Sequence, residues 1–88
     1  MTLYRLVILT PERTVFDGQV SSLVAPGAAG SLGVLAGHAP LATSLLPGRV
    51  EWADSDGRWT RGILRGTGFL EVAKVGVTLL TEGVDPTP

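Results

Sequence analysis

The side chains that could do chemistry in this 88-residue chain are few, and His38 is the first to consider. It is the only histidine, and the chain contains no cysteine. A hydrolytic triad needs a base beside an activated nucleophile, and no nucleophile-elbow spacing accompanies His38. A transition-metal site needs several nitrogen or sulfur ligands, which one histidine does not supply. The sequence therefore predicts no catalytic residue, no metal site and no cofactor-binding residue, and no acid–base pair supports an enzyme.

The glycine-rich run from Gly30 to Leu41 is a second candidate, because closely spaced glycines can surround a phosphate group. The run lacks the Gly-Lys-Ser/Thr ending of a P-loop, and it is too rich in glycine to open a helix. We interpret its glycines as strand and turn residues. Gly37 and Pro40 flank His38 and predict a sharp corner that presents this histidine at the surface.

Lys74 is the only lysine, and it lies near an expected hairpin tip between Glu71 and Gly76. Lipoyl and biotinyl carrier domains are flattened β-sandwiches of similar length that are modified at one hairpin lysine. The residues around Lys74 do not match the Asp-Lys-Ala or Met-Lys-Met of those carriers. A carrier domain modified at Lys74 is nevertheless the alternative function for this chain.

Composition limits the classes of partner. The formal net charge is −1, and the arginines at 58, 61 and 65 are interpreted as a solvated face, which argues against nucleic acid as a partner. Although 44% of the residues are hydrophobic, no apolar run approaches the roughly 20 residues of a membrane span. The N-terminus does not resemble a signal peptide. We expect an intracellular, soluble domain that meets a membrane only through another protein.

Short apolar segments separated by turn signals predict an all-β fold, since no segment shows a sustained helical period. Turns are expected at Asp17-Gly18 and at Asp54–Gly57. A four-residue loop at the second turn would place Trp52 opposite Trp59, although the sequence leaves this register open. We expect one domain over residues 1–82 and a fraying tail over residues 83–88. The expected strands cover residues 3–9, 13–16, 19–25, 42–46, 49–53, 58–65, 69–72 and 75–81.

Several blocks of the sequence, in order, resemble the epsilon subunit of F-type ATP synthases, which is called delta in mitochondria. The run from Gly30 to Leu41 is similar to the signature G-x-LGVLPGHAPL of that family. The other similar blocks are residues 9–18, 45–48, 66–72 and 77–80. The resemblance implies a ten-stranded β-sandwich or flattened barrel.

The same resemblance implies a non-catalytic rotor subunit of the central stalk. Such a subunit joins the gamma subunit to the membrane c-ring, in a complex with the alpha and beta subunits, and couples ion-driven rotation to ATP synthesis or hydrolysis. The implied location is peripheral, on the cytoplasmic face of the membrane. Epsilon subunits usually continue into a C-terminal helical hairpin that restrains ATP hydrolysis and in some members binds ATP. The present sequence stops where that hairpin would begin, so we expect it not to carry those functions.

Two interfaces can be carried over from the family by position. The gamma-facing residues would be Thr10, His38 and Thr43, with apolar Leu41 beside them. Many members place an acidic residue at the position of Ser31, where it can pair with basic groups on the c-ring. Without that charge, the contact here would rest on backbone hydrogen bonds, shape and apolar surface, and we expect Leu32→Asp to weaken coupling while the domain stays folded. The c-ring-facing loop would consist of Ala28, Ala29, Gly30, Ser31, Leu32 and Gly33.

Overall fold

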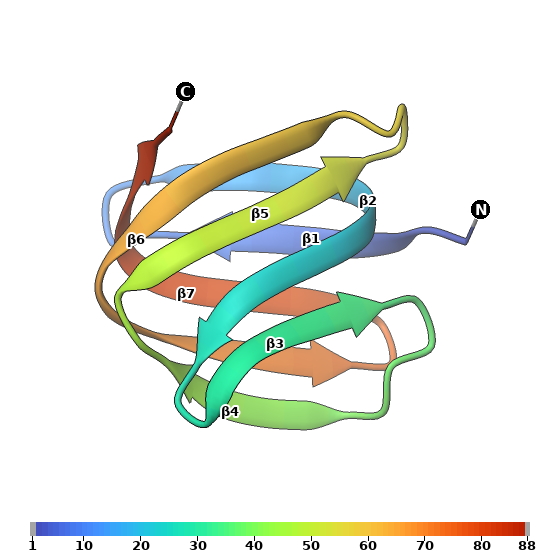
Figure 1. Cartoon of the computed structure of the whole chain (residues 1–88). Coiled ribbons are helices and arrows are strands. Elements are labelled where there is room, and N and C mark those ends of the chain that lie inside the picture. Colours follow the sequence, from blue (N-terminus) through green and yellow to red (C-terminus); the bar gives the residue numbers. More distant parts are fainter. Residues whose placement is uncertain (1, 88) are drawn as a thin grey trace.

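The computed structural model describes residues 2–87 and places them in seven β-strands (Figure 1). All neighbouring strands pair antiparallel except β1 and β7, which pair parallel. The all-β expectation is confirmed, whereas the expected count of ten strands is wrong. The strands are β1 (Tyr4–Leu9), β2 (Thr14–Gly27), β3 (Gly30–Leu35), β4 (Leu41–Leu45), β5 (Gly48–Asp54), β6 (Trp59–Ala73) and β7 (Gly76–Pro86).

Two long strands run through positions where we expected breaks. β2 passes through Asp17-Gly18 without turning, and Gly18 pairs with Leu6 of β1. A Cβ atom on Gly18 would lie 3.1 Å from the ring of Phe16, so this glycine makes room for a neighbouring ring. β6 likewise continues through Gly66, with a shift of register against β7 between Arg65 and Gly68. A shift of this kind bends a strand without ending it.

The C-terminal end of β7 also differs from expectation. Residues 83–86, which we expected to fray, pair with residues 62–65 of β6. The backbone N–H of Thr87 donates to the carbonyl of Arg61 at 3.2 Å, and the Arg65 Nε lies 3.3 Å from the Asp85 Oδ1. The expectation of a fraying tail is therefore wrong for residues 83–86, and Pro88 lies outside the described residues.

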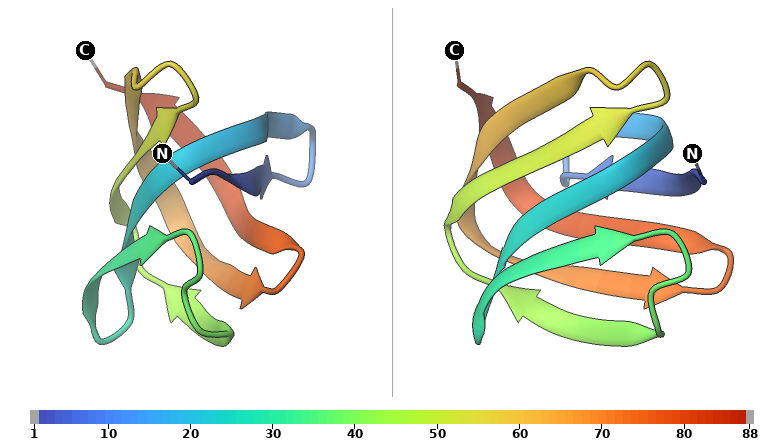
Figure 2. Two further views of the ribbon diagram at one scale, coloured as in Figure 1. Left: turned by 90° about the vertical axis from the view of Figure 1, so that its right-hand side faces the viewer. Right: turned by 45° about the vertical axis from the view of Figure 1, so that its right-hand side comes forward.

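The strands form one strongly curved sheet that closes on itself. β1 pairs with β2, β2 with β5, β5 with β6, β6 with β7 and β7 again with β1. β3 adds to the last part of β2, and β4 adds to the last part of β6. Figure 2 shows the resulting flattened barrel from two further sides. The closed hydrogen-bonding pattern leaves few free strand edges in the described part of the chain.

The core contains side chains from all seven strands. Leu6, Leu23, Leu45 and Leu70 are among the fully buried ones. Trp52 belongs to the core and packs on Phe16 with 5.4 Å between ring centroids. Close packing of this kind makes the domain stiff, because interiors of protein density deform little.

The tryptophan pair that a four-residue loop would have produced does not form. Ala53 pairs with Trp59, so Trp52 lies opposite Thr60. The β5–β6 loop is one residue shorter than the four-residue case, and Gly57 closes it with a φ of 80°. A three-residue hairpin loop characteristically ends in such a left-handed glycine. Trp52 consequently points into the core, and Trp59 remains 42% exposed on the outer surface.

Candidate interaction surfaces

One outer face of the barrel is apolar where a solvated sheet face would be polar. It is built from β1, β7, β6 and β4, which are neighbours in that order. Two rows of outward residues lie in register across the four strands. Phe69 and Leu80, at the centre of the first row, are 42% and 45% exposed. We call these eight residues the sheet face: Leu9, Leu80, Phe69 and Ser44 in one row, and Val7, Thr78, Glu71 and Ala42 in the other.

The composition of the sheet face indicates a protein contact. Antiparallel sheets that face water alternate apolar residues inside with polar residues outside. Here only Glu71 carries a charge, and apolar side chains hold most of the remaining positions. Contiguous exposed apolar residues on a folded domain mark interaction sites more often than solvent-facing surface. The sheet face therefore favours burial against a partner subunit.

A second candidate surface is the tip of the β2–β3 hairpin. Ala28 and Ala29 form its turn, between the paired residues Gly27 and Gly30. The φ of Gly30 is 129°, a conformation that favours glycine. The N–H of Ala28 donates to the carbonyl of Ser44 at 3.0 Å, which ties the tip to β4. The tip is therefore a fixed projection of the barrel.

The residues predicted to face the c-ring divide into two groups at this tip. Five of them are exposed: Ala28, Ala29, Gly30, Ser31 and Gly33. Leu32 is half-buried and packs against the core. An aspartate at position 32 would enter partly apolar surroundings, so Leu32→Asp should also lower the stability of the domain. Substitutions that test this surface belong at the exposed positions.

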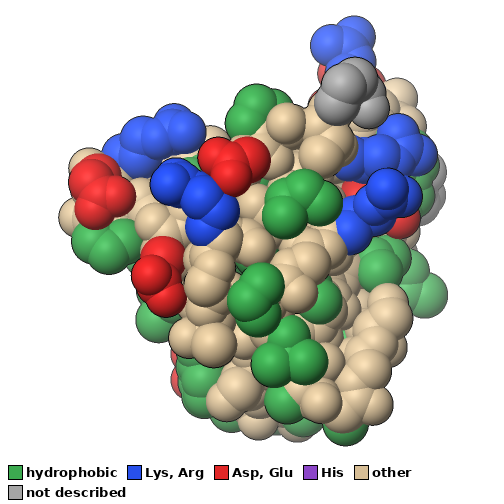
Figure 3. Space-filling model, turned by 60° about the vertical axis from the view of Figure 1, so that its left-hand side comes forward, with side chains coloured by type: hydrophobic (Ala, Val, Ile, Leu, Met, Phe, Trp, Pro, Cys, Tyr) green, Lys and Arg blue, Asp and Glu red, His purple; other side chains and the backbone are tan. Residues whose placement is uncertain are grey.

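The hairpin tip lies in the uncharged part of the molecule. Residues 18–48, which form the end of β2 with β3 and β4, contain no Asp, Glu, Lys or Arg. All formal charges of the chain lie outside this stretch. Figure 3 shows one side of the molecule, on which the charged side chains gather mostly in the upper half and hydrophobic and neutral groups occupy the lower half. A partner of this lower part meets a neutral surface.

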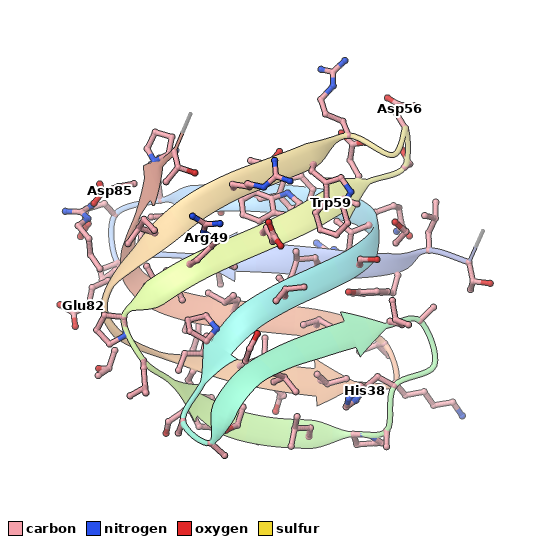
Figure 4. All side chains as sticks on the ribbon, in the orientation of Figure 1. His38, Arg49, Asp56, Trp59, Glu82 and Asp85 are labelled. Carbon is pink, nitrogen blue, oxygen red and sulfur yellow. The ribbon has the colours of Figure 1, made fainter. Side chains whose placement is uncertain are left out.

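The predicted gamma-facing residues do not form one cluster. Thr10 follows β1, and its Oγ1 accepts the N–H of Arg13 at 3.1 Å. His38 lies in the β3–β4 loop at the other end of the barrel, with its Nδ1 2.7 Å from the Ala39 carbonyl oxygen (Figure 4). Gly37, with a φ of 81°, forms the corner that we expected beside it. Thr10 and His38 thus lie toward opposite ends of the molecule.

The other two predicted residues, Leu41 and Thr43, lie on β4 and point inward. They pair with buried Val72 and Leu70, and Leu41 packs against the core. Sequence reasoning missed Phe69 and Leu80, the most exposed apolar members of the sheet face. The signal was present, because Phe69-Leu70 is a consecutive apolar pair on a strand and one member of such a pair must point outward.

Tyr4 links β1 to β3 through a hydrogen bond, and it predicts how the stability of the domain depends on pH. Its hydroxyl donates to the Val34 carbonyl at 2.7 Å, and burial raises the pKa of Tyr4 to about 12. The folded state favours the neutral phenol of Tyr4, because its pKa is higher there than the value of about 10 in the unfolded chain. The stability that this difference contributes is complete below about pH 10 and is lost as the pH rises toward about 12. We expect the free energy of unfolding to fall over this range in the wild type and to fall less in Tyr4→Phe.

Because Tyr4 is the only tyrosine, the absorbance of its phenolate reports this pKa directly. Denaturant unfolding at a series of alkaline pH values measures the stability of both proteins. A native phenol that titrates near the ordinary value of about 10 would contradict the burial of this side chain.

Residues 3–86 match the family model that describes the beta-sandwich domain of the ATP synthase delta/epsilon chain. An ATP synthase epsilon chain of Pelotomaculum thermopropionicum is 46% identical over 81 residues, covering 92% of this chain and 59% of the relative. One of Parvibaculum lavamentivorans is 42% identical over 79 residues, covering 90% of this chain and 59% of the relative. The chain therefore spans about three fifths of the length of these curated relatives.

Solved structures show the same fold. A chain in the Euglena gracilis mitochondrial ATP synthase, determined as an assembly of OSCP, F1 and c-ring, superposes with a TM-score of 0.89 at 23% identity, covering 98% of this chain and 54% of that one. A chain in the central stalk and c-ring of the Tetrahymena thermophila mitochondrial ATP synthase gives a TM-score of 0.77 at 17% identity, covering 94% of this chain and 66% of that one. At these identities the likeness concerns the fold.

Proposed function

Because the chain belongs to the delta/epsilon chain family of ATP synthases and corresponds to its N-terminal β-sandwich domain, we propose that it is a rotor subunit that joins gamma to the c-ring. In this proposal it catalyses no step itself and carries no cofactor. It transmits rotation between the ion-driven ring and the alpha and beta subunits, in a complex attached to the cytoplasmic face of the membrane. The c-ring is its only route to that membrane.

The observation that carries the proposal is the sheet face. A central-stalk subunit must hold gamma over a wide area so that torque passes without slip. Phe69 and Leu80 offer an apolar centre for such a contact, while Thr10 extends it beyond Leu9 at one end. His38 extends it at the other end of the barrel. The two family-derived positions thus flank the sheet face, although they lie far from each other.

The hairpin tip would contact the c-ring. It projects from the barrel at a fixed position because the Ala28 N–H is bonded to Ser44 and the Leu46 N–H donates to the Pro26 carbonyl at 2.8 Å. Ser44 also belongs to the sheet face. Force applied at the tip would therefore reach the gamma contact through one strand, β4.

The alternative hypothesis of a lipoyl or biotinyl carrier loses its support. Lys74 does lie in the β6–β7 turn, as expected for a hairpin tip. The resemblance to carrier domains rested on this one lysine, whereas the match to the delta/epsilon family covers residues 3–86.

Affinity purification of the tagged chain from its native membranes tests the proposal. We expect gamma, alpha, beta and c subunits to co-purify, and the chain to have its unmodified mass. Purification without any of these subunits would contradict the rotor function. A mass increment of a lipoyl or biotinyl group on Lys74 would restore the carrier hypothesis.

A further inference from the structure

A pocket opens at the end of the barrel where β1 begins, and residues of the β3–β4 loop and of the β6–β7 turn line it. Figure 1 shows these two connections at the same end of the barrel. The pocket has a volume of about 680 Å³. Its lining is mixed, and the larger side chains Tyr4, Val34, Val72 and Val77 come from four different strands. We call it the end pocket. It is distinct from both the sheet face and the hairpin tip.

Two strongly exposed apolar side chains stand at the rim of the end pocket. Leu35, at the end of β3, is 63% exposed, and Val75, in the β6–β7 turn, is 91% exposed. Exposed apolar side chains that lie beside a recess are a feature of interaction sites. Their position on either side of this recess suits an inserted apolar side chain.

The charged part of the lining is basic. Arg5 and Lys74 line the end pocket beside the polar residues Gln19 and His38, and no Asp or Glu does so among the described residues 2–87. Arg5 is held by Asp17, whose Oδ1 and Oδ2 accept from its Nε and Nη2 at 2.9 and 2.8 Å. Within the same residues Lys74 makes no ion pair. Lys74 is therefore the charge that is available to a ligand.

We propose that the end pocket binds a segment of a partner protein that presents an apolar side chain directly beside a carboxylate. The apolar side chain would enter between Leu35 and Val75, and the carboxylate would pair with Lys74. Charge complementarity and the apolar rim together select this chemistry. A membrane surface fits less well, because a single unpaired lysine beside a recess does not form the broad basic patch that anionic lipids attract. The end pocket shares only His38 with the proposed gamma contact and none of its lining with the hairpin tip, so the inference goes beyond those two contacts.

Heteronuclear NMR titration of the whole chain tests this inference. The probe is the peptide acetyl-Ser-Leu-Glu-Ser-amide, and its matched control carries Gln in place of Glu. We expect shifts of amides around the end pocket, and about two- to fivefold tighter binding of the Glu peptide, the range expected for one exposed ion pair. Lys74→Gln should abolish this difference, whereas Arg58→Gln, an equal loss of charge in the β5–β6 loop, should leave it unchanged.

Val75→Ser should weaken binding of both peptides, because it removes an apolar contact that they share. Three results would overturn the inference: no shifts at the end pocket, equal affinity for the Glu and Gln peptides, or a response of the pocket amides to phosphatidylglycerol vesicles in place of the peptides. Lys74 and Val75 are exposed turn residues, so neither substitution is expected to unfold the chain.

Discussion

Replacing Phe69 with serine should lower the affinity of this chain for the gamma subunit by at least about tenfold, the loss typical of truncating a central aromatic residue at an interface. Phe69 lies between Ser44 and Leu80 in the sheet face, so its ring would be the largest apolar group covered by gamma. The affinity can be measured by calorimetric titration of the purified chain into gamma. The expectation depends on the proposal that gamma covers this face.

Trp59→Ser is the matched control for this prediction. Trp59 lies on the same strand as Phe69, is aromatic, and has the same exposed fraction of 42%. It pairs with Ala53 of β5 and therefore belongs to another part of the barrel surface (Figure 4). We expect the Trp59→Ser variant to bind gamma with unchanged affinity. Thermal unfolding of both variants checks that each remains folded. Equal losses in the two variants, or no loss in either, would contradict the assignment of the sheet face.

The local character of the fold could be predicted from the sequence, but the roles of individual glycines could not. Asp17-Gly18 and Asp56-Gly57 look alike as turn signals, yet only the second forms a turn. A Cβ atom at position 18 would press on the Phe16 ring, and this contact depends on tertiary packing. The two glycines look alike in the sequence, but only Gly57 has a positive φ in the structure. This is why β2 and β6 each run through a position where the sequence predicted a break.

For the candidate surfaces, the turns could be predicted from the sequence, but the directions of the strand side chains could not. The corner at His38 and the hairpin turn at Lys74 follow from nearby glycines, and both are present. The inward direction of Thr43 depends on its register against Leu70, since a shift of one residue reverses every side chain of a strand. Register is set by pairing between strands distant in sequence. The outward position of Phe69 was hidden for the same reason.

Replacing Ala29 with lysine should weaken association with the c-ring by at least about tenfold, because a charge in a neutral or like-charged contact costs several kcal/mol. Ala29 is exposed in the turn of the hairpin tip, so the isolated domain should keep its thermal stability. Ser55→Lys is the matched control: it adds the same charge at the exposed tip of the β5–β6 hairpin, away from the uncharged stretch. Reconstituted vesicles containing each variant allow ATP hydrolysis and ion pumping to be measured together.

The sign of the charge makes the hairpin-tip prediction specific. If basic groups of the ring face this tip, Ala29→Lys should lower the number of ions pumped per ATP hydrolysed, whereas Ser31→Glu should preserve or strengthen coupling. Both positions are exposed, and the Ala28–Ser44 hydrogen bond that fixes the tip involves neither side chain. A general disturbance of the turn would weaken coupling in both variants. If Ala29→Lys and Ser31→Glu both show the same coupling as Ser55→Lys, the hairpin tip does not contact the c-ring. The c-ring would then have to be contacted through another part of the barrel.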